Sequence, residues 1–179
     1  MTKIQNTRRF RNSDLGFTLI ELLIVAAMTA ILTTIVTVNF RQLRSSQEVS
    51  TTASDLISKV REVQSQILTG KVVSGQAEPA DAYEIILTTG ASSYRIDWDI
   101  NSLKNTLETV NLSTNVRLNQ VYVNNAPVGA VTLRITAPFG RILADGSSNK
   151  VVKLDLSQVS SGNTKTVIID GISGRMGLE

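Results

Sequence analysis

Residues 16–40 of the chain read GFTLIELLIVAAMTAILTTIVTVNF, and this stretch decides how the protein is organised. From Phe17 to Phe40 it is apolar apart from Glu21, several threonines and Asn39. As an α-helix, these residues extend over roughly 36 Å, which is more than the roughly 30 Å hydrocarbon core of a bilayer. We therefore predict that residues 17–40 form a membrane-spanning helix.

A short basic segment, residues 1–16, precedes the apolar run. Its charged residues are Lys3, Arg8, Arg9, Arg11 and Asp14. Positively charged flanks stay in the cytoplasm, so we predict a single-pass protein with its N-terminus inside. The segment also accounts for the whole formal charge of +3. The chain has 18 basic and 15 acidic side chains, and 14 of each lie after residue 16. The basic pI is therefore a topology signal and does not by itself indicate a nucleic-acid-binding domain.

The helix is predicted to continue beyond the membrane segment. Between Arg41 and Leu68 there is no Pro or Gly, and apolar residues recur at steps of three and four. These residues are Val49, Ala53, Leu56, Val60, Val63 and Ile67. Such a stripe is typical of an amphipathic helix that packs on a domain, and Gly70 is a suitable stop. Residues 41–70 are thus the amphipathic half of one helix that runs from Phe17 to Leu68.

Residues 71–179 have the pattern of a β-rich globular domain. After a loop that contains Gly and Pro, Tyr83–Thr89 and Tyr94–Ile100 flank the turn at residues 90–93 and predict a hairpin. Four further segments alternate β-branched and apolar residues between turns: Val116–Val123, Ala130–Ala137, Val151–Leu156 and Thr166–Ile169. We predict an α+β fold in which the long N-terminal helix packs on a mostly antiparallel β-sheet.

Composition limits the chemistry of the protein. The chain has no Cys and no His. This excludes thiol nucleophiles, disulfides, histidine acid–base catalysis and the usual zinc ligand sets. We expect a protein that is not an enzyme and that needs no cofactor.

Gly16, the candidate cleavage residue, lies directly before the apolar run. A secretory signal peptide instead places its cleavage site after its apolar run. In the sequence Gly16-Phe17-Thr18-Leu19-Ile20-Glu21 the chain closely resembles the type IV prepilin family, which includes pilus subunits and type II secretion pseudopilins. The resemblance implies a type IV pilin-like fold, cleavage after Gly16 by a prepilin peptidase, and methylation of the new amine of Phe17.

Glu21 requires a physical explanation of its own. A carboxylate within an apolar membrane segment costs roughly 2.5–3.5 kcal/mol on insertion scales, so a partner or a function is expected. Residues 17–40 contain no basic side chain. By resemblance, Glu21 pairs with the N-terminal amine of an adjacent subunit during assembly. The alternative is a Glu near the interface that extends to water.

The C-terminal part is similar to the closing strands of minor pilins and H-type pseudopilins. The similarity rests on Val131–Gly140, Val151–Leu156 and Thr166–Arg175. Some relatives that take up DNA carry a second basic residue two positions after the arginine that corresponds to Arg175, whereas this chain has Gly177. Arg175 is therefore a candidate DNA contact within an incomplete pattern, and the alternative is a residue at the end of a strand.

One set of oxygen-bearing side chains has the spacing of a calcium loop. It comprises Asp97, Asp99, Asn101, Asn105 and Glu108. Position 6 of such a loop is normally Gly but is Ser102 here, and Trp98 and Ile100 alternate with the acids as on a strand. The alternative to a metal site is therefore a row of acids on the solvated face of a strand.

We accordingly predict a structural subunit, a minor pilin or a pseudopilin, of a type IV pilus or type II secretion filament. Its partners are the prepilin peptidase and other pilin or pseudopilin subunits. We expect the protein in the cytoplasmic (inner) membrane first, and in an extracytoplasmic filament after assembly. One alternative is a minor pilin that binds DNA or a surface. The other is a protein of different function held by an uncleaved signal anchor.

Overall fold

The computed structural model describes residues 17–73 and 75–179, without the side chains of residues 35–39 and 41. The predicted leader, residues 1–16, lies outside the described residues. The chain divides into two units, one ending at Phe40 and the other running from Arg41 to Glu179.

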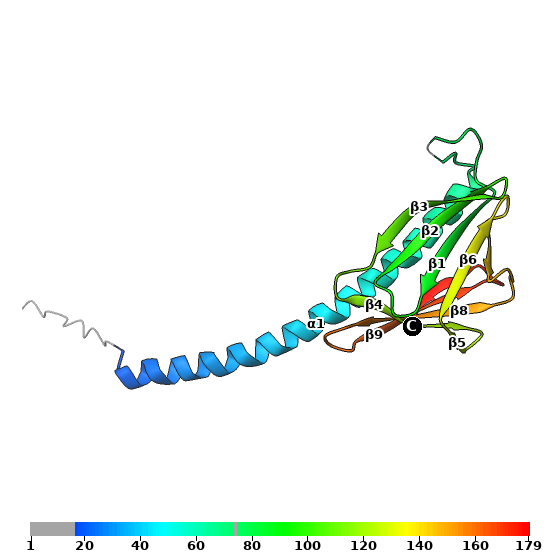
Figure 1. The fold of residues 1–179 in the computed structure, drawn as a ribbon. Coiled ribbons are helices and arrows are strands. Elements are labelled where there is room, and N and C mark those ends of the chain that lie inside the picture. Colours follow the sequence, from blue (N-terminus) through cyan, green and yellow to red (C-terminus); the bar gives the residue numbers. More distant parts are fainter. Residues whose placement is uncertain (1–16, 74) are drawn as a thin grey trace, which may run out of the picture. The chain divides into compact units, whose positions relative to one another are not determined.

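One helix, α1, runs from Leu19 to Leu68 (Figure 1), which confirms the predicted uninterrupted helix. Thr18 caps its N-terminus, and the Oγ1 of Thr18 accepts a hydrogen bond from the backbone N–H of Glu21 at 3.3 Å. A threonine oxygen in this position satisfies one of the free N–H groups at a helix N-terminus.

The C-terminus of α1 is a Schellman motif centred on Gly70. The N–H of Lys71 donates to the carbonyl of Gln66 at 3.1 Å, and the N–H of Gly70 donates to the carbonyl of Ile67 at 3.3 Å. Gly70 has a φ of 61°, the left-handed conformation that this ending uses. The predicted stop at Gly70 is confirmed.

In the first unit, α1 exposes large apolar side chains on all of its sides. They are Leu19, Ile20, Leu22, Leu23, Ile24, Val25, Met28, Ile31 and Leu32. Its threonine hydroxyls donate to helix carbonyls three or four residues earlier, at 2.7–2.9 Å, as Thr29, Thr33 and Thr34 do. Within the described part of the chain, no helix is both long and apolar enough to cross a membrane.

In the second unit, α1 buries a single stripe. Val49, Ala53, Val60 and Val63 are at most 1% exposed, and Leu56 and Ile67 are also buried. The predicted amphipathic stripe is therefore confirmed.

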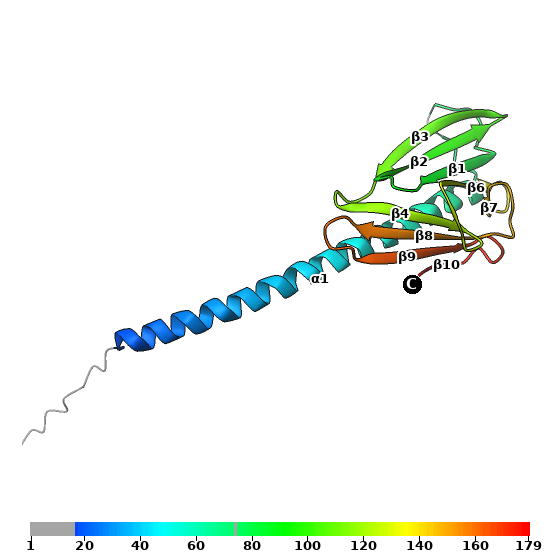
Figure 2. The ribbon, with the colours of Figure 1, turned by 60° about the horizontal axis from the view of Figure 1, so that its bottom comes forward.

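The strands of the second unit form two sheets (Figure 2), where the sequence predicted one. The first has the order β3-β2-β1-β6-β7, and its strands are β1 (Ala82–Thr88), β2 (Ser93–Ile100), β3 (Leu103–Asn111), β6 (Ala130–Thr136) and β7 (Arg141–Ala144). The second has the order β10-β9-β8-β4-β5, and its strands are β4 (Val116–Val123), β5 (Ala126–Val128), β8 (Val151–Gln158), β9 (Thr164–Asp170) and β10 (Met176–Leu178). All neighbouring strands are antiparallel.

Both sheets and the helix stripe share one hydrophobic core. Alternate residues of the first sheet, such as Tyr83, Ile85 and Leu133, are buried in it. The second sheet contributes residues such as Leu118 and Leu154. Alternation on a strand sends every second side chain to one face, so each sheet directs one apolar face to this core.

Polar contacts anchor the start of the buried stripe. The carboxylate of Glu48 accepts a hydrogen bond from the hydroxyl of Ser113 and another from Nε2 of Gln158 at 2.9 Å. One turn earlier, Asn163 Nδ2 donates to Ser45 Oγ at 2.6 Å. These bonds tie the helix to the connection before β4, to the end of β8 and to the connection between β8 and β9.

The turn that follows β9 packs closely around Gly171. A Cβ at this position would lie 2.9 Å from the carbonyl oxygen of Lys150 and 3.0 Å from that of Ser148, whereas a Cβ at Gly177 would meet nothing within 4 Å. We expect Gly171→Ala to lower the free energy of unfolding by about 1–3 kcal/mol and Gly177→Ala to change it by less than about 0.5 kcal/mol. Equal effects in denaturant unfolding of the two variants would contradict this packing.

Candidate functional site

The N-terminal motif lies at the start of α1. Phe17 is 81% exposed and precedes the capping Thr18, and Glu21 is exposed in the first turn of the helix. Gly16 lies outside the described residues. A carboxylate in the first turn interacts favourably with the positive end of the helix dipole.

Glu21 forms no ion pair with any described residue. Its backbone N–H bonds Thr18, but this bond does not involve the carboxylate. The carboxylate is therefore free to accept a partner from outside the described chain. The apolar side chains that follow it supply no charge of their own.

Arg175 is exposed in the turn between β9 and β10. The carbonyl of Arg175 accepts a hydrogen bond from the N–H of Asp170 at 2.9 Å, and Ser173 Oγ donates to Asp170 Oδ2 at 2.6 Å. Hydrogen bonds from Ser173 and from the Ile172 backbone lower the pKa of Asp170. Arg175 lies directly before the edge strand β10. A contact between Arg175 and nucleic acid stays a prediction.

The interpretation of Asp97 and Asp99 as acids on a solvated face is wrong. Asp97 is 8% exposed and Asp99 is 5% exposed. They lie on the face of the first sheet opposite to the core, beside Glu84, which is 8% exposed. The sequence missed this because part of the cover comes from another strand, as Arg134 of β6 pairs with Asp99.

These basic side chains pair with all three acids. Arg134 of β6 contacts Glu84 at 2.5 Å and Asp99 at 2.8 Å. Lys104 of β3 contacts Glu84 at 2.7 Å, and Arg95 contacts Asp97 at 3.0 Å. Arg95 Nε donates its hydrogen bond to Asp97 Oδ2 at 3.1 Å, and the Oδ1 atoms of Asp97 and Asp99 are buried without a hydrogen bond from a described residue.

The pKa of Glu84 reflects this pairing. Burial raises the pKa, but the hydrogen bonds and charges of Lys104 and Arg134 outweigh burial and hold the pKa below its ordinary value. The carboxylate is therefore stabilised in its charged form. The cluster links four strands of the first sheet, β1, β2, β3 and β6, by charge-assisted bonds.

The calcium-loop spacing does not converge in space. Glu108 pairs with Lys59 of α1 at 2.6 Å, and the N–H of Asn101, in the β2–β3 turn, bonds Asp81 Oδ2 at 2.7 Å. Asp97 and Asp99 instead pair with arginines on the other face of the sheet. Among the residues described, no three His, Cys, Asp or Glu side chains are placed to hold a metal ion.

Comparison with known families identifies the N-terminal segment. Residues 11–37 match the family described as the prokaryotic N-terminal methylation motif, which is the signature of type IV prepilins and pseudopilins. The motif implies processing by a prepilin peptidase and assembly with other pilins. Comparisons with curated proteins and with solved structures gave no match.

The charged cluster predicts how stability depends on pH. Glu84→Gln should lower the free energy of unfolding near pH 7 by about 2 kcal/mol, because Arg134 and Lys104 lose their shared anion. The folded-state pKa of Glu84 lies below the ordinary 4.5, so this contribution is present above pH 4.5 and is lost as the pH falls through the folded-state pKa.

Denaturant unfolding of both proteins between pH 7 and pH 3 checks this prediction. The exposed Glu78 provides a control, and Glu78→Gln should change stability by less than about 0.5 kcal/mol. A wild-type-to-Glu84→Gln difference that grows as the pH falls would contradict the pairing.

Proposed function

We propose that this protein is a structural subunit, a minor pilin or a pseudopilin, of a type IV pilus or type II secretion filament. The observation that carries the proposal is the methylation motif over residues 11–37, within which α1 begins and exposes apolar side chains on all sides. In this proposal, a prepilin peptidase cuts after Gly16 and the new amine of Phe17 is methylated. The helix remains in the mature protein.

The apolar helix anchors the subunit in the cytoplasmic membrane before assembly. The threonine hydroxyls of this segment bond to its own carbonyls, so they need no water as partner. The basic residues of segment 1–16 favour an N-terminus in the cytoplasm. In the assembled filament the same side chains pack against the helices of neighbouring subunits, and the two-sheet unit is outside the membrane.

Glu21 supplies the charge that sets the register of a new subunit. Cleavage after Gly16 creates an amine on Phe17, and residues 17–40 offer Glu21 no other cation. Pairing between Glu21 of one subunit and the Phe17 amine of the next satisfies both charges in an apolar environment. Such a pair is expensive to break, because either group alone remains buried and charged.

Filament incorporation of Glu21 variants tests this function. We expect Glu21→Ala and Glu21→Gln to be processed normally and to enter filaments more than about tenfold less than wild type, since both remove the charge. Quantitative immunoblotting of sheared filaments, with peptidase-processed protein as the reference, measures the yield.

The capping contact offers a matched control. Thr18→Ala removes the Oγ1 that accepts the Glu21 N–H and should weaken the helix end by about 1 kcal/mol, but it keeps the carboxylate. Incorporation of Thr18→Ala should therefore exceed that of Glu21→Gln. Normal incorporation of Glu21→Gln would refute the role of the charge.

A further inference from the structure

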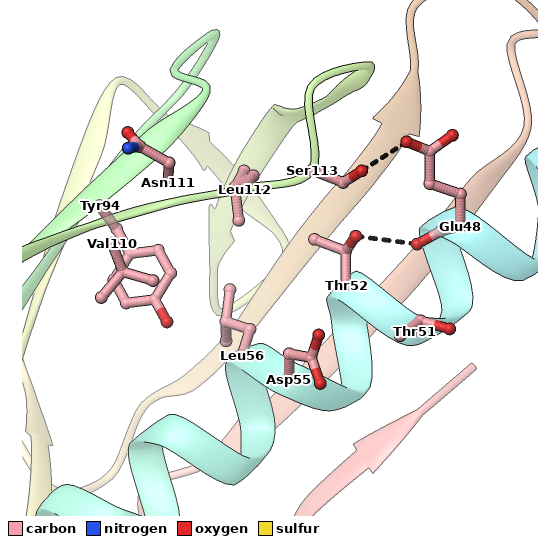
Figure 3. Close-up of a pocket in the computed structure, with 10 residues that line it drawn as sticks. All are labelled: Glu48, Thr51, Thr52, Asp55, Leu56, Tyr94, Val110, Asn111, Leu112 and Ser113. Carbon is pink, nitrogen blue, oxygen red and sulfur yellow. Dashed lines mark hydrogen bonds between the residues drawn. The ribbon is translucent and has the colours of Figure 1, made fainter.

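A hollow of about 410 Å³ lies in the second unit between α1 and the chain that leaves β3 (Figure 3). Its walls are one side of the helix from Glu48 to Leu56, Tyr94 of β2, and residues 110–113. Leu56, Val110 and Leu112 give it an apolar surface, and no Lys or Arg lines it.

Two acceptors that line the hollow have no partner among the described residues. Asp55 is exposed and forms no ion pair with a described residue. Tyr94, which is 4% exposed, also lines the hollow, and its hydroxyl forms no hydrogen bond with a described residue. Glu48, in contrast, is already engaged by Ser113 and Gln158.

The electrostatic character of the hollow is negative. Burial, and then the charges of Glu108, Asp55 and Glu62, raise the pKa of Tyr94 far above its ordinary value. Lys59 already pairs with Glu108 and Glu62, so the carboxylate left for a cation placed next to the phenol is that of Asp55. Such a cation also gains from the face of the aromatic ring.

We propose that this hollow receives the side-chain ammonium of a lysine from a neighbouring filament subunit. This inference rests on the proposed filament function. The aliphatic stem of the lysine would cover Leu56 and Leu112, and the ammonium would donate to Asp55 and to the hydroxyl of Tyr94. Separate single acceptors suit the three divergent donors of an ammonium better than the planar fork of an arginine. The carboxylates do not group as metal ligands within the described chain.

The absence of Cys from the chain allows a direct test. A single cysteine at Thr51, an exposed residue of the lining, is coupled in intact filaments to a short cross-linker that joins a thiol to an amine. We expect a product of two-subunit mass, and peptide mass spectrometry should assign its far end to one lysine of the adjacent subunit. Ser46→Cys is the control, because Ser46 is exposed about 140° around the helix from Thr51.

Removing the charge of Asp55 tests the chemistry of the contact. In the Thr51→Cys background, Asp55→Asn should lower the yield of the two-subunit product about fivefold, and Glu78→Gln, outside the hollow, should leave the yield unchanged. If the protein enters filaments but Thr51→Cys gives no such lysine product, or gives it no more than Ser46→Cys, this inference alone is overturned. A yield that does not respond to Asp55→Asn overturns it as well. A protein that never enters filaments contradicts the filament function and this inference together.

Discussion

The burial of one stripe of α1 is the interaction on which the second unit depends. Val49, Leu56, Val60 and Ile67 occupy the same core as the inner faces of both sheets. The helix contains no Pro or Gly from Leu19 to Leu68. One helix therefore buries a single apolar side in the globular core of the second unit and, nearer its N-terminus, exposes apolar side chains all round between Leu19 and Leu32.

The sequence predicted the interior of each sheet and missed its borders. The six interior strands carry the alternating apolar pattern that a buried face requires, and each was predicted. The four strands that were missed are the edge strands, β3, β5, β7 and β10. Residues of β3 are exposed or half-buried throughout, and the other three edge strands have only three or four residues each. An edge strand is held by backbone pairing to one neighbour, so its side chains need not alternate.

The sites divide into those formed by contiguous residues and those formed by residues far apart along the chain. The N-terminal motif is contiguous, so its residues could be identified from the sequence. The burial of Asp99 depends on Arg134, which is 35 positions away along the chain, and no local pattern indicates that pair. Likewise, the hollow beside Asp55 exists only because the segment after β3 returns to the helix. Spacing along the chain suggested a calcium loop, but its members lie on β2, on β3 and in the turn between them. Glu108 of β3 pairs with Lys59 of α1, whereas Asp97 and Asp99 pair with arginines on the other face of the sheet.

The central claim is that the chain is made as a prepilin and is cut before its apolar helix. Intact-mass and N-terminal peptide analysis of the protein purified from membranes or filaments tests it most directly. We predict a mature chain that begins at Phe17 with a methylated amine and retains the apolar helix. A mature protein that still begins at Met1, or one cleaved after the apolar run, would contradict the account.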